Sequence, residues 1–182
     1  MRLAAVALAI LLAACVPSLH PFYLEKDVYF DAQVLGEWAP GDGQSRWTFS
    51  AHEPGAYRLV HADDKGREGR FRARLFRMQG ERFLDLYPEE PAGESNAYHR
   101  AHLVKAHTLL HVVELGPRLR LSAMNPDWLR KRLDAEPGLI AHERRGDQVV
   151  LTAPTGALQA FVLRLLGEPE AFGKPVELAR AR

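Results

Sequence analysis

Four histidines lie close together in the chain and raise the question of a metal site. They are His99, His102, His107 and His111. Imidazole nitrogen is a common ligand of zinc and copper. Side chains alternate between two faces along an extended strand, so His102 would lie opposite His107 and His111. Because no cysteine and no suitably spaced aspartate joins them, we predict surface or packing histidines, with no metal and no other cofactor.

The densest basic stretch contains Arg67, Arg70, Arg72, Arg74 and Arg77. Strand alternation places three of these arginines on one face. They would suit anionic lipid headgroups, or a lumen that holds an acidic ligand. They would equally suit a solvated face that pairs with Glu68 and Glu81, which is the interpretation we favour. Because the lumen interpretation remains open, Arg72 and Arg74 are candidate ligand-binding residues.

Asp85 is the one charge in an otherwise apolar stretch, Phe83–Tyr87. Burying a carboxylate without a partner costs far more than burying a neutral polar group. We therefore predict a structural pair with Arg72 or Arg74 across the Gln79-Gly80 hairpin.

Sequence motifs of catalysis are missing from the chain. It has no Gly-x-Ser-x-Gly, no phosphate-binding glycine loop and no His-Glu-x-x-His. We predict a protein that is not an enzyme and has no catalytic residues.

Apolar and polar residues alternate through the first two thirds of the chain, and clusters of Gly, Pro and Asp interrupt them. This pattern is typical of antiparallel strands separated by turns. The predicted strands cover residues 35–38, 47–51, 57–61, 70–77, 83–87, 98–105, 108–114 and 118–123. About eight strands are enough to close a small barrel without an exposed edge.

A helical pattern begins after the last of these strands. Asn125-Pro126 is a typical helix start, and a second helix begins near Thr152 or Thr155 and ends at Gly167. The predicted fold class is mainly β: a single antiparallel barrel of about eight strands with two C-terminal α-helices. Residues 168–182 are predicted to form a mostly polar tail.

Aromatic residues of the predicted strands are candidates for lining a hydrophobic pocket. They are Trp38, Trp47, Phe49, Tyr57 and Phe71. An eight-stranded barrel has room for its own side chains or for one small ligand. The same residues would therefore either bind a ligand or fill the interior.

The N-terminus reads as an export signal. Met1-Arg2 is followed by the apolar run Leu3–Leu12, which is too short to span a bilayer. The sequence Leu12-Ala13-Ala14-Cys15 resembles the lipobox of bacterial lipoproteins. The resemblance implies that residues 1–14 are removed and that Cys15 is acylated, for example by palmitate; the alternative is an ordinary cleaved signal with an incidental cysteine.

The remaining domain boundaries follow from this start. Residues 15–23 would form the lipidated cysteine and an extended tether, and residues 24–167 the barrel with its helices. Loss of Arg2 would leave 23 basic and 23 acidic residues, and this neutral balance argues against a nucleic-acid partner. The single cysteine excludes an internal disulfide.

The segment Gly36-Glu37-Trp38 is similar to the Gly-x-Trp opening of lipocalins and related calycins. In that family the tryptophan plugs one end of an eight-stranded barrel, and a helix follows the last barrel strand. The Thr-Asp-Tyr-type motif and the late arginine motif of lipocalins have no clear counterpart here, and two helices are predicted instead of one. The wider pattern, from Leu19-His20-Pro21 to Pro126-Asp127-Trp128-Leu129, resembles a family of uncharacterised bacterial lipoproteins.

Two functions fit these expectations. The first is a cell-envelope lipoprotein, anchored in the membrane through Cys15, that binds a small hydrophobic or amphipathic ligand in its barrel. The second is an envelope scaffold with a filled barrel and a protein partner. Val16, which is not aspartate, follows the cysteine, and in a two-membrane cell this favours the outer membrane, facing the periplasm.

Overall fold

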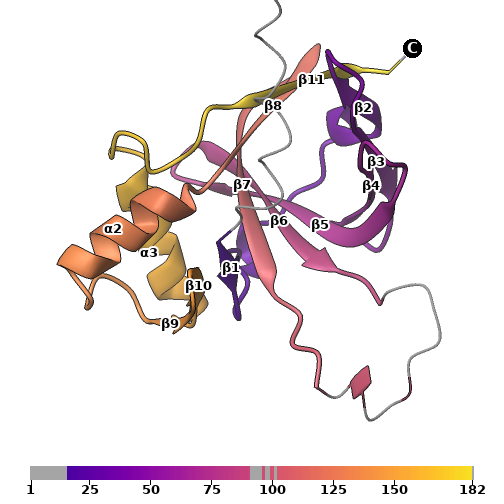
Figure 1. Ribbon diagram of the computed structural model, residues 1–182. Helices are drawn as coiled ribbons and strands as arrows, with labels where there is room; N and C mark the ends of the chain where they lie inside the picture. Colours follow the sequence, from indigo (N-terminus) through magenta and orange to yellow (C-terminus); the bar gives the residue numbers. More distant parts are fainter. Residues whose placement is uncertain (1–15, 91–95, 97–98, 101, 182) are drawn as a thin grey trace, which may run out of the picture.

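The computed structural model describes residues 16–90, 96, 99–100 and 102–181, so Cys15 and the predicted signal peptide lie outside the described residues. Eight antiparallel strands form a closed barrel (Figure 1). They are β2 (Gly36–Pro40), β3 (Arg46–Ala51), β4 (Tyr57–Ala62), β5 (Glu68–Met78), β6 (Glu81–Pro88), β7 (His107–Leu115), β8 (Arg118–Ala123) and β11 (Val176–Arg180). Pairing of β6 with β7 closes the sheet. The predicted fold class is confirmed.

The eighth strand is not the one that the sequence pattern indicated. The described residues of segment 98–105 form no strand. Instead β11, from the segment interpreted as a polar tail, pairs with β8 on one edge and β2 on the other. Only Leu178 of this strand is fully buried, and Val176 packs against the same core. So few apolar residues give a weak sequence signal.

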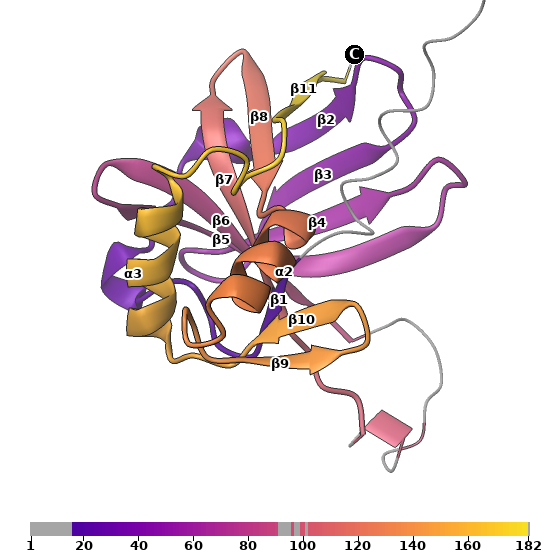
Figure 2. The ribbon, with the colours of Figure 1, turned by 60° about the vertical axis from the view of Figure 1, so that its left-hand side comes forward.

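Two helices lie against the outside of the barrel, between β8 and β11 in the chain (Figure 2). Helix α2 (Pro126–Ala135) begins as predicted at Asn125, whose side chain accepts hydrogen bonds from two backbone amides. Helix α3 (Thr155–Leu165) has no side-chain cap, and the Thr155 hydroxyl donates to the Pro21 carbonyl instead. The hairpin of β9 (His142–Arg145) and β10 (Gln148–Leu151) joins them. In the described part of the chain, neither helix has the length and hydrophobicity needed to cross a membrane.

The N-terminal segment is built into the domain from Val16 onward. Strand β1 (Pro17–Ser18) pairs antiparallel with β7 and parallel with β10. Val16 is 4% exposed and Phe22 is fully buried. Residues 16–23 therefore differ from the free extended tether that the two prolines predicted, because their apolar side chains pack between the barrel and the helices.

Two hydrophobic cores share the wall formed by β5, β6 and β7. One core fills the barrel, and the other lies between the outer face of this wall, the N-terminal segment and the helices. Phe83 and Leu84 are both fully buried, although they point to opposite faces of β6. The apolar stretch around Asp85 is thus explained by burial on both faces.

One end of the barrel is plugged around Trp38. The 3-10 helix η2 (Ala32–Val34) lies across this end, and the indole of Trp38 donates to the Val34 carbonyl at 2.9 Å. The Arg180 guanidinium lies 4.3 Å from the centre of the Trp38 ring and donates to the carbonyls of Gln33 and Leu35. Gly36 has φ of +115°, and a Cβ there would lie 2.8 Å from the Arg180 Nη1 atom. Glycine is therefore required at position 36, two residues before Trp38.

We predict that Arg180→Ala lowers the free energy of unfolding by about 1–3 kcal/mol, because two carbonyls of the plug lose a charged donor and the Trp38 ring loses its cation–π contact. Urea unfolding followed by tryptophan fluorescence measures the change. Arg118→Ala is the matched control. Arg118 of β8 forms an exposed ion pair with Glu177, which lies on β11 like Arg180. We expect a loss below about 1 kcal/mol for this control. Equal losses in both variants would show that Arg180 does not stabilise the plug.

Candidate functional site

The five candidate aromatic residues face the barrel interior. Trp38, Trp47, Phe49 and Tyr57 are buried, and Phe71 packs against them from a partly buried position. They belong to a cluster in which seventeen of the described residues are buried. Much of the interior is therefore occupied by the protein's own side chains.

The Tyr57 hydroxyl at the plugged end is bonded within the protein. The Tyr57 hydroxyl donates to the Asp31 carbonyl and accepts from the Asp31 amide, at 3.0 and 2.7 Å. Phe30 stacks on the Tyr57 ring. Burial raises the pKa of Tyr57 to about 12. The hydroxyl of the neighbouring Tyr29 is buried and has no hydrogen-bond partner among the described residues.

The opposite end of the barrel brings together Trp47, His61 and Phe71. Neighbouring strands are antiparallel, and β2 starts at the plug. This second end is therefore where β4 ends and where β3 and β5 start. His61 is paired in register with Trp47, and the edge of one ring faces the other at 4.9 Å between centroids. Leu59, two residues before His61, is paired with Phe71. We call Trp47, His61 and Phe71 the aromatic end.

His61 is the polar group of the aromatic end. It is 7% exposed and forms no hydrogen bond or ion pair with any residue that the structure describes. Burial lowers the pKa of His61, so its imidazole is uncharged at neutral pH. A neutral imidazole offers one donor and one acceptor. The arrangement is therefore suited to a ligand with an uncharged polar group next to an apolar part.

His61 was not among the residues predicted from the sequence. Its signal was its parity, since Tyr57, Leu59 and His61 alternate with exposed or partly exposed residues along one strand. That alternation predicts an inward-facing histidine in a barrel. A histidine among inward-facing apolar residues was the available pointer to this site.

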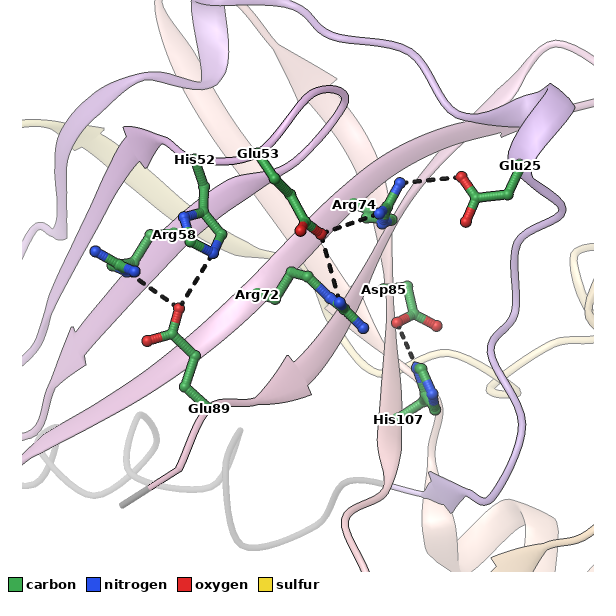
Figure 3. A network of polar contacts seen from close by, with 9 residues as sticks. All are labelled: Glu25, His52, Glu53, Arg58, Arg72, Arg74, Asp85, Glu89 and His107. Carbon is green, nitrogen blue, oxygen red and sulfur yellow. Dashed lines mark hydrogen bonds and ion pairs between the residues drawn. The ribbon is translucent and has the colours of Figure 1, made fainter. Parts of the chain in front are cut away.

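Arg72 and Arg74 lie on the outer face of β5, so they do not line the lumen (Figure 3). Arg74 bonds both Glu25 and Glu53 at 3.0 Å, and Arg72 approaches Glu53 at 3.4 Å. The predicted paired face is therefore present. Arg70 lies 3.6 Å from Glu68, as expected, whereas Glu81 bonds His111 instead of an arginine. Nearby, Glu89 bonds Arg58. We call this set the outer ion-pair network.

The sequence predicted that Asp85 pairs with an arginine, but in the structure its partners are other groups. Its register partner is Arg74, but that guanidinium is directed at the two glutamates. One Asp85 oxygen accepts from the Phe22 amide at 3.0 Å, and the other lies 2.7 Å from His107 Nδ1 (Figure 3). Since a carboxylate only accepts, His107 carries the proton on Nδ1. The prediction of a structural pair was right in kind, but its partners are different.

The clustered histidines have separate surroundings. His107 bonds Asp85, and His111 bonds Glu81 at 2.9 Å. Within residues 16–90, 96, 99–100 and 102–181, no three metal-ligating side chains come together. His99 and His102 have polar or ring contacts of their own.

Comparison of the chain with protein-family models, with curated proteins and with solved structures finds no match. Function is therefore inferred from the side chains of the aromatic end, the outer ion-pair network and the N-terminal segment.

We predict that Asp85→Ala lowers the free energy of unfolding by about 1–3 kcal/mol, because the buried Phe22 amide and His107 Nδ1 both lose their partner. Thermal or urea unfolding measures the loss. Glu53→Gln makes the same charge change in the outer ion-pair network, at a side chain that is 40% exposed, and should cost less than about 1 kcal/mol. A comparable loss in the two variants would contradict the role of Asp85.

Proposed function

We propose that the protein is a membrane-anchored envelope lipoprotein whose lipocalin-like barrel holds a small amphipathic ligand at its aromatic end. It acts as a binding protein and not as an enzyme. The observation that carries the proposal is His61, a nearly buried imidazole without a hydrogen-bond partner in the described chain, beside Trp47 and Phe71.

The geometry around Trp38 supports the lipocalin-like interpretation. The closed eight-stranded barrel and the plugging tryptophan correspond to the expectation from Gly36-Glu37-Trp38. The Arg180 guanidinium, which covers the tryptophan ring, closes this end further. One feature differs from the expectation: both helices precede the last barrel strand, whereas the lipocalin helix follows it.

The chemistry of the aromatic end limits the ligand. Trp47 and Phe71 offer apolar ring surface, and the neutral His61 imidazole can bond a carbonyl, a hydroxyl or a protonated carboxyl group. Trp38 and Leu75, deeper in the barrel, are fully buried by their neighbours. The ligand is therefore expected to bind near the barrel end and not deep in the interior. A short amphipathic molecule suits this site better than a long acyl chain.

The membrane anchor is proposed from the lipobox-like sequence that ends at Cys15. Acyl chains on this cysteine would hold the mature protein on the envelope membrane, and the following Val16 favours the periplasmic face of an outer membrane. Two or more chains are needed for stable anchoring, because a single chain binds only reversibly.

An envelope scaffold with a protein partner is the second candidate. It is favoured by the outer ion-pair network, in which Arg58, Arg72 and Arg74 are held by carboxylates on a partly exposed wall. Such prearranged charges give specificity to a protein interface. In this case the filled interior would serve stability alone.

We predict that protein purified from membranes carries a small amphipathic molecule that organic extraction and mass spectrometry detect. His61→Leu should lower its affinity about three- to tenfold, as expected for the loss of one neutral hydrogen bond. His52→Leu is the matched control, because His52 lies on the outer face beside Glu89. A protein without any extracted molecule, together with one envelope protein trapped by crosslinking, would favour the scaffold instead.

A further inference from the structure

We propose that the wall formed by β1, the β9–β10 hairpin and α2 rests on the bilayer, so that the lipid anchor fixes the orientation of the barrel. This inference rests on the proposed acylation of Cys15. The proposed surface would contact the polar headgroup layer of the membrane.

The folded body leaves no slack behind the anchor. Seven extended residues after the cysteine would have given a reach of about 25 Å. In the structure Val16 is 4% exposed, Pro17 is paired with β7, and Ser18 is paired with both β7 and β10. An acylated residue directly before Val16 has its Cα about 3.8 Å from a buried position. The bilayer surface must therefore lie next to the protein.

The pairing of β1 identifies the wall. β1 runs parallel to β10, with Ser18 beside Leu151. Counting back along both strands places Val16 level with Val149, one residue from the exposed Gln148 at the start of β10. Arg130 of α2 donates to the Asp147 carbonyl, which joins the helix to this hairpin. Figure 2 shows α2, β9 and β10 on the side of the molecule where β1 lies.

The exposed side chains of this wall match headgroups and not hydrocarbon. Lys131, Glu143, Arg145 and Gln148 are all exposed. Charged side chains are costly in the hydrocarbon layer. The wall is therefore expected to contact the headgroup layer without insertion, and the acyl chains alone enter the hydrocarbon.

The barrel supplies a matched control position. In the closed sheet β3 lies four strands from β7 in either direction, whereas β1 is paired with β7 itself. Ser50 is an exposed residue of β3, on the wall opposite to the proposed contact. A probe at Ser50 should therefore stay away from the bilayer.

The test compares Gln148→Cys with Ser50→Cys in the acylated full chain. Cys15 is the only cysteine, so after its acylation each introduced thiol is the single site for a fluorophore. The labelled proteins are reconstituted in vesicles of phosphatidylethanolamine and phosphatidylglycerol that contain a headgroup-nitroxide lipid. We expect the probe at position 148 to lose most of its fluorescence and the probe at position 50 to lose little. Equal quenching at the two positions would overturn the proposal.

Two further measurements separate this proposal from the anchor itself. Mass spectrometry of the N-terminal peptide reports acylation; if Cys15 is not acylated, the proposed lipoprotein function fails first. With acylation present, a Gly-Ser linker of about 12 residues inserted between Cys15 and Val16 should abolish the difference between positions 148 and 50. A difference that persists with the linker would show that the short connection is not what orients the barrel.

Discussion

A single buried carboxylate connects the three parts of this fold. Asp85 lies on the strand that separates the barrel core from the helical core, where an unpaired charge would be prohibitively costly. Its two oxygens are taken by His107 of the barrel and by the amide of Phe22. The Phe22 carbonyl in turn accepts from Gln159 of α3. The N-terminal segment is thus held between barrel and helix at one residue. Upstream it places Val16, and downstream it leads to the plug.

Local patterns were sufficient for most of the barrel. Apolar patterning and turn residues located seven of its strands, mostly through alternation, because most of these strands bury one face against the interior. Asn125-Pro126 located the start of α2 for an equally local reason, the capping of free amides. The sequence also indicated burial of β6 on both faces, since Phe83–Tyr87 carries a single charge. In each case the signal lies within a few neighbouring residues.

Features that depend on distant partners escaped prediction. Strand β11 has one fully buried side chain, Leu178, and becomes a strand because the barrel has two open edges that it can pair with. Residues 16–23 become part of the domain because the helical core covers Phe22. The choice of His107 over Arg74 for Asp85 depends on Glu25 and Glu53, which neutralise that arginine from other segments. None of these partners can be identified from spacing along the chain.

The wall that we propose to face the bilayer meets the aromatic end at the same end of the barrel. Antiparallel order places the end of β4, with His61, and the start of β7 away from the plug. β1 is paired with His107 and Thr108, the first residues of β7. The segment that would bring the bilayer to the protein therefore joins the barrel at the end where an unbonded imidazole is available, and Arg180 seals the other end. For the proposed amphipathic ligand, this arrangement would shorten the path from the membrane through water. Recognition at the barrel end would then suffice without a deep cavity.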